Sequence, residues 1–469
     1  MDALLTEITA IVGHQHLLEG SDVSARQDDW MQASPCQARA IVRPGDTEEL
    51  SQVMAACHRA RQPVVTHGGL TGLVRGGVVS PGEIAISLER LNRIEAIDPI
   101  SGTLTVQAGT LLQRVQEAAN EAGMQFALDL GARGSCTIGG NIATNAGGVR
   151  VIRYGMMREQ VLGLEAVLAD GTQVSSMNHM LKNNAGYDLK QLFIGSEGTL
   201  GIVTRAVLKL QPQQPAMQTA MVACNTFSDL TALLPYVRQT LGEQLAAFEV
   251  MWHNHYALLT EESGRHTPPL ATDAAFYVLI ETLGSDQEAT AQRFESVIES
   301  AFEKGHISDA VIASTGQQRE RLWAIREDIE GLLHAMSPHF TFDVSLPIPE
   351  MDHYAHTLEQ QVAQRWPEGR VVVFGHLGDG NLHITVTPGP IESDAALKEE
   401  KLAVEALVYG PLAAMGGSVS AEHGIGLDKR AYLHLSRNPA EVAVMRALKK
   451  TLDPHALLNR DKILADETS

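Results

Sequence analysis

Two periodicities of apolar residues alternate along the chain, and they predict an alternation of strands and helices. Short apolar runs next to Gly, Pro or Asp are typical of strands, and an apolar residue at every third or fourth position is typical of an amphipathic helix. The strands predicted in the first half are residues 40–44, 63–66, 84–88, 103–106, 164–168 and 173–174. The helices predicted there are residues 1–20, a helix that Asp46 or Thr47 caps and that carries Leu50, Val53, Met54 and Cys57 on one face, and residues 111–122.

A stretch rich in glutamine and proline, residues 211–215, ends this strand-rich part and is the predicted domain boundary. Beyond it, residues 228–241 and 287–304 have the helical period, and the apolar run 276–280 predicts a strand. Two further strands, residues 371–374 and 382–386, are predicted to pair across a glycine turn. A chain of 469 residues is long enough for two domains or more.

The charge of the chain excludes some classes of partner. With 36 basic and 56 acidic residues, the formal net charge is -20 at pH 7, which argues against nucleic acid or an anionic membrane surface. No run of about eighteen apolar residues predicts a membrane span. The first residues, 1–7, carry acid where a secretory signal needs basic residues. Four sparse cysteines without a Cys-x-x-Cys pair do not predict a disulfide framework, and together these features favour a cytoplasmic protein.

Three long segments rich in Gly, Ser, Thr and Asn lie in the first predicted domain, at residues 67–77, 131–148 and 195–203. None is a Walker loop or a dinucleotide-binding Gly-x-Gly-x-x-Gly turn, and any one of them alone could be a set of tight turns. Glycine allows the backbone to approach a ligand closely, at a cost in conformational entropy. Three such loops in one domain therefore predict an extended cofactor lying among them.

The turn between the predicted strands 371–374 and 382–386 has a histidine on each side, His376 and His383. On a hairpin, this spacing lets the two imidazoles face one another. Glu422 would add a carboxylate from a distant segment. Two histidines and one carboxylate with an open position suit Zn²⁺, with Mn²⁺ or Fe²⁺ as alternatives.

His423, next to Glu422, is the predicted general base, because a neutral imidazole can take a hydroxyl proton near neutral pH. Neighbouring side chains on a regular strand point to opposite faces. Both residues can reach one site only if the strand ends or twists there, and Gly424 and Gly426 favour such an end. A histidine that points into the core is the alternative.

These motifs resemble those of a known enzyme family. The three glycine loops, in this order, resemble the flavin-binding domain of the vanillyl-alcohol oxidase superfamily. The segments 376–383 and 420–426 are similar to those of the branch that holds D-2-hydroxyglutarate dehydrogenase, D-lactate dehydrogenase and the glycolate oxidase flavoprotein subunit. The resemblance implies an α+β fold with a PCMH-type FAD-binding domain and an α+β cap domain built on an antiparallel sheet. The implied parts are an N-terminal helical segment 1–35, the FAD-binding domain 36–214, the cap domain 215–425, and a segment 426–469 that returns to the FAD domain.

The resemblance also implies that the FAD is bound without a covalent link. Relatives with covalent flavin in the first loop carry a histidine just after the paired glycines, where this chain has Leu70. The residues expected to bind FAD are Thr66, His67, Gly68, Gly69, Leu70, Thr71, Gly72, Gly76, Gly77, Gly131, Ser135, Thr137, Gly139, Gly140, Asn141, Asn145, Gly147, Gly148, Glu197, Gly198, Gly201, Ile202 and Asn459.

Arg326 matches the arginine with which this family clamps the substrate carboxylate, a task suited to the planar guanidinium. A helix-surface arginine paired with an acid such as Glu330 is the alternative. The hydroxyglutarate enzymes tend to carry threonine, lysine and asparagine where this chain has Glu330, Thr341 and Thr385. Two of these changes, at Glu330 and Thr341, remove or reverse help from positive charge and so disfavour a substrate with a second carboxylate. The expected substrate-binding residues are Arg326, Glu330, Thr341, Thr385 and His423.

The sequence therefore predicts an FAD-dependent dehydrogenase that oxidises a D-2-hydroxy acid, D-lactate or one like D-2-hydroxyglutarate, with the help of a metal. Electrons would pass to an external acceptor such as an electron-transfer flavoprotein, a quinone or a cytochrome. The alternatives are the flavoprotein subunit of a glycolate oxidase, a metal-independent flavin alcohol oxidase on the same fold, and a metal-stabilised binding protein without turnover. A homodimer is left open.

Overall fold

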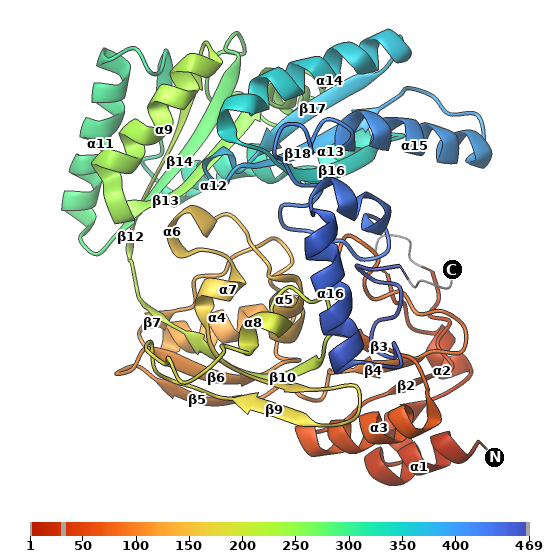
Figure 1. The fold of residues 1–469 in the computed structure, drawn as a ribbon. Coiled ribbons are helices and arrows are strands. Elements are labelled where there is room, and N and C mark those ends of the chain that lie inside the picture. The colour runs from red at the N-terminus through yellow and green to blue at the C-terminus, as the bar shows by residue number, and fades with distance from the viewer. Residues whose placement is uncertain (1, 30–33, 466–469) are drawn as a thin grey trace. The chain divides into compact units, whose positions relative to one another are not determined.

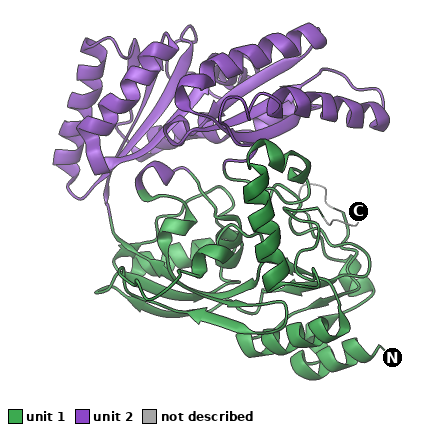
Figure 2. Ribbon diagram, in the orientation of Figure 1, with its two compact units in different colours: residues 1–148, 154–213, 422–469 green, residues 149–153, 214–421 purple. Residues whose placement is uncertain are grey.

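The computed structural model describes residues 2–29 and 34–465 of the chain (Figure 1). They divide into two compact units (Figure 2). Unit 1 consists of residues 1–148, 154–213 and 422–469, and unit 2 of residues 149–153 and 214–421. The N-terminal segment is grouped with unit 1, whereas the short segment 149–153 is grouped with unit 2.

Unit 1 holds two main sheets. The first has the strand order β1-β2-β4-β3, in which β2, β4 and β3 are parallel and β1 is antiparallel to β2. Its strands are β1 (Leu17–Leu18), β2 (Ala40–Val42), β3 (Val64–His67) and β4 (Ile84–Ser87). The second sheet is antiparallel, with the order β5-β6-β10-β8-β9. Its strands are β5 (Ile94–Asp98), β6 (Thr103–Gln107), β8 (Val161–Val167), β9 (Gln173–Ser176) and β10 (Ile202–Lys209), and a small sheet joins β7 (Met124–Gln125) to β11 (Gln211–Pro212).

Helices complete unit 1, and α3 (Thr47–Ala60) begins at the predicted cap, where Asp46 accepts the N–H of Glu49. Its predicted apolar face is confirmed, because all four of its predicted apolar residues are buried. The remaining helices are α1 (Ala3–Val12), α2 (Ser21–Ser24), α4 (Leu112–Glu121), α5 (Ile138–Thr144), α7 (Met157–Gln160), α8 (Lys190–Phe193), α16 (Pro439–Leu452) and the short η1 (His14–His16) and η6 (Arg430–Leu435); α6 (Val151–Tyr154) crosses the division.

The prediction of one helix over residues 1–20 was wrong. Helix α1 ends at Gly13, whose φ of 84° is incompatible with a right-handed helix, and the chain then continues through η1 into strand β1. The strands predicted at residues 164–168 and 173–174 are confirmed as β8 and β9, which pair with each other across Asp170 and Gly171.

Unit 2 is built on one antiparallel sheet with the strand order β15-β12-β14-β13-β17-β18-β16. The strands are β12 (Ala216–Cys224), β13 (Leu245–Trp252), β14 (Phe276–Gly284), β15 (Asp309–Ile312), β16 (Phe340–Ser345), β17 (Arg370–Gly375) and β18 (Asn381–Thr387). The predicted pairing of residues 371–374 with 382–386 is confirmed by the register of β17 and β18. The prediction of a mixed helix-and-sheet fold with antiparallel sheets is also confirmed.

One face of this sheet forms a hydrophobic core with α12, the helix that carries Arg326. Met251, Tyr277, Leu279 and Phe374 lie on it and pack against the buried residues of α12 and α13. The helices of unit 2 are α9 (Phe227–Leu241), α10 (His253–Ala257), α11 (Gln287–Glu303), α12 (Gly316–Glu327), α13 (Ile329–Ala335), α14 (Met351–Arg365) and α15 (Asp394–Tyr409), with the short η2 (Gly242–Gln244), η3 (Leu258–Glu262), η4 (Ile348–Glu350) and η5 (Leu377–Asp379). Within the described ranges, no helix has the length and apolar character needed to cross a membrane.

Candidate active site

The three glycine-rich loops of unit 1 lie against one another. Gly69 approaches the second loop so closely that a Cβ atom there would lie 2.2 Å from the carbonyl oxygen of Ser135. In the third loop, the N–H of Gly195 donates to Ile142 O at 3.0 Å and the N–H of Glu197 donates to Ala143 O at 2.7 Å. The structure therefore brings together the loops that the sequence predicts to share one cofactor.

Asn459, from the C-terminal segment, links the first of these loops to the third. Its Oδ1 accepts the N–H of Thr66 at 2.9 Å, and its Nδ2 donates to Glu197 O at 2.7 Å. Asn459 is buried. The side-chain oxygen of Thr66 is buried and has no hydrogen-bond partner in the described part of the chain. A buried polar atom without a partner beside a glycine loop fits the polar groups of a bound cofactor.

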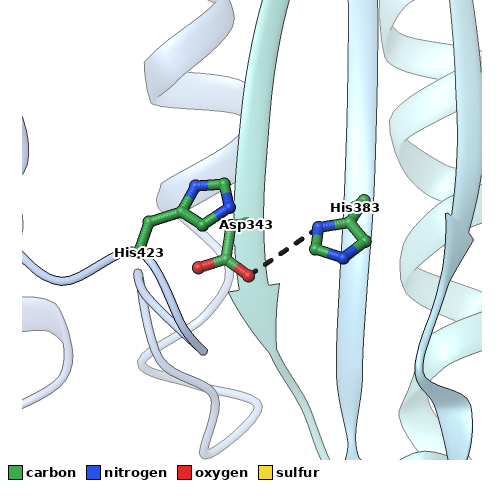
Figure 3. Close-up of side chains that lie close together, drawn as sticks. All are labelled: Asp343, His383 and His423. Atoms are coloured by element: carbon green, nitrogen blue, oxygen red, sulfur yellow. Dashed lines mark ion pairs between the residues drawn. The ribbon is translucent and has the colours of Figure 1, made fainter. Parts of the chain in front are cut away.

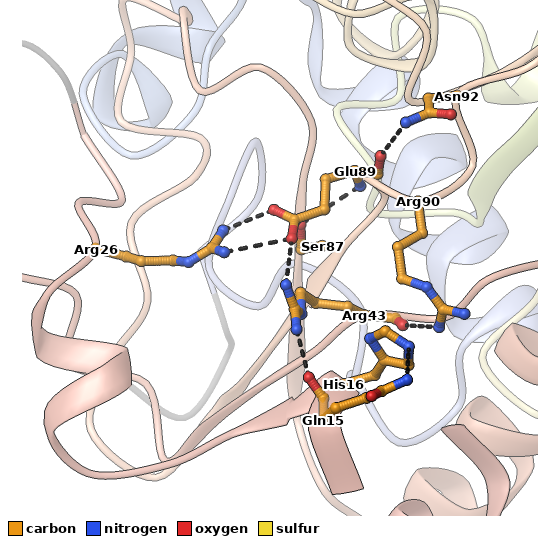
Figure 4. A network of polar contacts seen from close by, with 8 residues as sticks. All are labelled: Gln15, His16, Arg26, Arg43, Ser87, Glu89, Arg90 and Asn92. Atoms are coloured by element: carbon orange, nitrogen blue, oxygen red, sulfur yellow. Dashed lines mark hydrogen bonds and ion pairs between the residues drawn. The ribbon is translucent and has the colours of Figure 1, made fainter. Parts of the chain in front are cut away.

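A pocket of about 290 Å³ opens at the first loop. It is lined by Arg26, Gln27, Ile41, His67, Gly68, Leu70, Ser87 and Glu89. On its polar side, Glu89 accepts from Arg26 at 2.6 Å and from Arg43 at 2.9 Å (Figure 4). Burial lowers the pKa of His67 to about 4, and the ring bonds Gly77 O through Nε2 at 2.8 Å. His67 is therefore a neutral residue at neutral pH, with one ring nitrogen bound to the loop that it begins.

In unit 2, the glycine turn brings His376 and His383 together. His383 lies on β18 opposite Phe374 of β17, and His376 follows the end of β17 directly. Their ring centroids are 5.2 Å apart, and one ring nitrogen of each lies within 4.8 Å of the other. Two Zn–N bonds of about 2.0–2.1 Å span up to about 4 Å, so modest rotations of the rings would bring both nitrogens to one ion. The donor chemistry of this pair fits a divalent transition metal.

Asp343 is a carboxylate beside His383 that was not among the predicted metal ligands. Asp343 lies opposite His383 in the β16–β18 ladder, is fully buried, and has Oδ1 3.9 Å from His383 Nδ1 (Figure 3). That distance is an ion-pair contact but too long for a hydrogen bond. Asp343 Oδ1 also accepts from Asn381 Nδ2 at 2.8 Å. Asp343 is therefore a carboxylate of unit 2 that lies beside His383.

A third carboxylate, Glu249 on β13, joins two of the predicted functional residues. Its Oε1 contacts His376 Nδ1 at 2.6 Å. Its Oε2 accepts a hydrogen bond from Arg326 Nε at 3.0 Å and forms an ion pair with Arg326 Nη2 at 2.9 Å. Burial would raise the pKa of this carboxyl, but the charges and hydrogen bonds of His376 and Arg326 lower it below its ordinary value. Arg326 itself is only 5% exposed. The alternative of a surface arginine paired with Glu330 is wrong.

Glu249 could have been found from the sequence. It is the one charged residue in the apolar run 245–252, and a charge in such a strand is rare unless it is paired. The other predicted substrate residues of unit 2 differ in their exposure. Glu330 on α13 and Thr341 on β16 are exposed, whereas Thr385, opposite Thr341 in the ladder, is buried.

Glu422 and His423 lie in a loop of unit 1 that its neighbours fix firmly. Glu422 Oε1 accepts the N–H of Gly148, in the second glycine loop, at 2.9 Å. Glu197 accepts the N–H groups of Ile425 at 2.7 Å and Gly426 at 2.8 Å. Burial raises the pKa of Glu197 although these two bonds oppose the shift. Gly424, which follows His423, has a φ of 87°, so the chain turns there and does not continue as a strand.

Comparison with known proteins defines the class of this chain. Residues 38–176 match the family described as FAD binding domain, and residues 213–463 match the family described as FAD linked oxidases, C-terminal domain. The second match alone spans more than half of the chain.

Relatives with 36–40% sequence identity place the chain among hydroxy-acid dehydrogenases. The mitochondrial D-2-hydroxyglutarate dehydrogenase of Arabidopsis thaliana is 38% identical over 457 residues, 97% of this chain and 80% of the relative. The D-2-hydroxyglutarate dehydrogenase of Xanthomonas citri pv. viticola is 40% identical over 447 residues, 95% of this chain and 93% of the relative. A putative mitochondrial D-lactate dehydrogenase of Schizosaccharomyces pombe is 36% identical over 447 residues, 93% of this chain and 84% of the relative.

Solved structures share the fold. Substrate-bound p-cresol methylhydroxylase has a TM-score of 0.78 at 16% identity and covers 99% of this chain and 97% of that one. Alkyldihydroxyacetonephosphate synthase has a TM-score of 0.75 at 16% identity, and the match covers 98% of this chain and 86% of that one. The chain is an FAD-linked oxidoreductase whose fold is shared with p-cresol methylhydroxylase. It belongs to the family of FAD-dependent hydroxy-acid dehydrogenases that includes the D-2-hydroxyglutarate dehydrogenases, and the predicted family is confirmed.

Proposed function

We propose that the protein oxidises a small D-2-hydroxy acid with one carboxylate to the 2-keto acid. His376, His383 and Glu422 would hold a divalent metal, Zn²⁺ by preference, Arg326 would bind the carboxylate, and His423 would act as the base. The observation that supports this proposal most is the contact of one buried carboxylate, Glu249, with both Arg326 and His376. It links the predicted carboxylate clamp directly to a predicted metal ligand.

The remaining hydrogen-bonding edge of Arg326 supports its role as the clamp. Nε donates to Glu249 Oε2, and Nη2 forms an ion pair with the same oxygen. A guanidinium carries five N–H groups along three edges. The Nη1–Nη2 edge can therefore donate two parallel hydrogen bonds to a substrate carboxylate. The Phe374 ring lies 4.6 Å from Arg326 Cζ and supports the guanidinium plane by a cation–π contact. An arginine held in this way binds the substrate without losing further side-chain entropy.

Chain connectivity supports the joint action of the Glu422 and His423 loop with the histidines of unit 2. Ala421, the last residue of unit 2, donates its N–H to Asp343 Oδ2 at 3.1 Å, and Glu422 and His423 follow directly. Asp343 lies opposite His383 in the ladder. His423 would take the hydroxyl proton of the substrate through a neutral ring nitrogen.

The cofactors supply the rest of the chemistry. Bound FAD would supply the hydride acceptor for C2 of the substrate, and a bound divalent ion would supply positive charge that favours ionisation of the substrate hydroxyl. The residues of this chain bind the carboxylate, orient C2 and remove the hydroxyl proton, so that positioning and charge stabilisation provide much of the acceleration. The FAD would be held without a covalent link by the three glycine loops and Asn459. Electrons would leave to an external acceptor.

The residues near the predicted clamp support a substrate with a single carboxylate. Glu330 and Thr341 stand where the hydroxyglutarate enzymes tend to have threonine and lysine, and neither offers a positive charge to a second carboxylate. D-lactate is therefore preferred over D-2-hydroxyglutarate in this proposal. The external acceptor, a homodimeric state and a cytoplasmic location stay predictions.

Anaerobic bleaching of the flavin tests the proposal. The purified holoenzyme is mixed with D-lactate, L-lactate, glycolate, D-2-hydroxyglutarate and an aryl alcohol, with and without prior treatment with a chelator. We expect D-lactate to bleach the flavin fastest, and the chelator to abolish bleaching until Zn²⁺ is restored. Bleaching by the L-isomer alone would contradict the stereochemistry. Bleaching by the aryl alcohol without metal would favour a metal-independent alcohol oxidase.

A further inference from the structure

Two strands in the middle of the unit 2 sheet each carry one buried glutamate in an otherwise apolar sequence. Glu249 on β13 and Glu281 on β14 are each 1% exposed. Glu249 pairs with Leu279 and Glu281 pairs with Ala247, and paired residues of an antiparallel ladder point to the same face. Both carboxylates therefore lie on the face that α12 covers. A buried carboxylate is costly unless it is paired, so each must have strong partners.

Helix α12 binds both carboxylates through residues one turn apart. Trp323 Nε1 donates to Glu281 Oε2 at 2.9 Å, and Arg326 donates to Glu249. These two contacts fix both the position of α12 along its axis and its rotation about that axis. The remaining contacts of the carboxylates differ: Glu281 also binds Arg150 at 2.6 Å and Thr219 at 2.9 Å, whereas Glu249 binds His376.

We propose that Glu249 is a positioning residue that holds the metal ligand His376 and the substrate clamp Arg326 at a fixed separation. This inference rests on the function proposed above. The carboxylate uses a different oxygen for each partner, Oε1 for His376 and Oε2 for Arg326. A 2-hydroxy acid carries its carboxylate and its hydroxyl on adjacent carbons, so the clamp and the metal must stand at one set spacing. A single rigid carboxylate between them provides that spacing.

The bond to His376 also selects the tautomer of the imidazole. When Nδ1 carries the proton and donates a hydrogen bond to Glu249, the lone pair lies on Nε2, which is then the nitrogen able to coordinate a metal. A carboxylate in this place also strengthens the imidazole as a ligand. His376 is only 5% exposed, so Glu249 takes the hydrogen-bonding role that water would have at an exposed histidine.

The variant Glu249→Gln separates these roles from simple packing. A glutamine has the same shape but only one acceptor oxygen, so its amide N–H₂ would face either His376 Nδ1 or the guanidinium of Arg326, both of which are donors. We expect the affinity for Zn²⁺ to fall by about 10- to 100-fold, as for other partners of metal-binding histidines. We also expect KM for D-lactate to rise by about 10-fold or more, because Arg326 loses its orientation.

The control is Glu281→Gln, which changes an equally buried carboxylate that touches α12 but neither His376 nor Arg326. Zn²⁺ affinity is measured by competition with a chromophoric chelator, KM and kcat by flavin reduction, and folding by thermal melting of each holoenzyme. We expect Glu281→Gln to lower the melting temperature while leaving Zn²⁺ affinity within about twofold of the wild type. Glu249→Asp, which keeps the charge but is one methylene too short to reach both partners, serves if Glu249→Gln does not fold. It should lose affinity for Zn²⁺ as well.

Equal Zn²⁺ affinity and equal KM in the wild type and in the Glu249 variants would overturn the inference. So would a loss of Zn²⁺ affinity of the same size in Glu281→Gln. A wild-type protein that binds no Zn²⁺ and reduces no flavin with any 2-hydroxy acid would instead contradict the proposed function, so the two failures are distinguishable.

Discussion

The backbone N–H of Ala421 donates to Oδ2 of Asp343 at 3.1 Å. The Ser420 hydroxyl donates to the same oxygen at 3.4 Å, and Asn381 Nδ2 donates to Oδ1 at 2.8 Å. Three donors thus converge on one buried carboxylate, from the β18 strand and from the segment that leads to Glu422 and His423. Asp343 fixes the start of the loop that carries the predicted base.

We expect Asp343→Asn to slow flavin reduction by about 10- to 100-fold while FAD stays bound. Asparagine has one acceptor oxygen in place of two, so at least one of the three donors would face an N–H₂ group and lose its partner. A buried donor left without a partner costs about 1–3 kcal/mol. Stopped-flow flavin reduction by D-lactate measures the effect, and the flavin absorbance of the purified protein measures retention of FAD.

The control for that variant is Ser420→Ala, which removes only the longest of the three bonds and should change the rate by a smaller factor. Reduction of Asp343→Asn at the wild-type rate would show that the Asp343 contact does not position the loop.

We expect His383→Ala to lower bound Zn²⁺ to well below one ion per chain, while the flavin content stays unchanged. The remaining ligands would leave the ion with too few protein donors for a stable tetrahedral site. Elemental analysis after dialysis measures the metal, and His356→Ala, an exposed histidine on α14, is the control. A full complement of Zn²⁺ in His383→Ala would exclude His383 as a ligand.

The parts of the site that are local in sequence could be predicted from it. His376 and His383 stand on one hairpin, so their spacing and the glycine turn were enough to predict that the rings meet. Resemblance to a family predicted a role for Arg326, which the structure shows buried beside Glu249; binding of the substrate by Arg326 stays a prediction. Glu249 is 127 residues from its partner His376, and Asp343 is 78 residues from Ala421. Such contacts depend on the order of strands in the sheet, which a pattern of apolar residues does not specify.

The predicted substrate specificity can be tested by exchanging Glu330 and Thr341 for the residues that the hydroxyglutarate enzymes tend to carry. We expect the double variant Glu330→Thr, Thr341→Lys to raise the ratio of kcat/KM for D-2-hydroxyglutarate to that for D-lactate by about 10-fold. The first change removes a carboxylate that repels the second carboxylate of D-2-hydroxyglutarate, and the second change adds an ammonium that attracts it. The exposure of both residues makes the exchange compatible with folding. Glu330→Thr with Thr341→Gln removes the same carboxylate but adds no positive charge, so it should raise the ratio by a smaller factor. An unchanged ratio in the lysine variant would place these residues outside the substrate pocket.

Acid sensitivity of the fold is expected to depend on His255 of α10. The ring is fully buried against Phe374, with centroids 4.6 Å apart, and neither ring nitrogen has a hydrogen-bond partner in the described part of the chain. Burial, assisted by the charge of Arg326 and opposed by Asp328, lowers the pKa of His255 to about 3. Because this pKa lies below that of an unfolded histidine, the unfolded chain takes up the proton first as the pH falls. The free energy of unfolding is therefore lost below about pH 6.5, down to about pH 3.

At pH 5 this single group would lower the free energy of unfolding by about 2 kcal/mol relative to pH 7.5, since each pKa unit corresponds to about 1.4 kcal/mol. His255→Phe keeps an aromatic ring against Phe374 and removes the titration. Urea unfolding at pH 7.5 and pH 5 should show a smaller loss of stability in this variant than in the wild type. The exposed His353→Phe on α14 is the matched control and should lose as much as the wild type. An equal loss in His255→Phe would mean that another group carries the acid sensitivity, because Phe at this position binds no proton in either state.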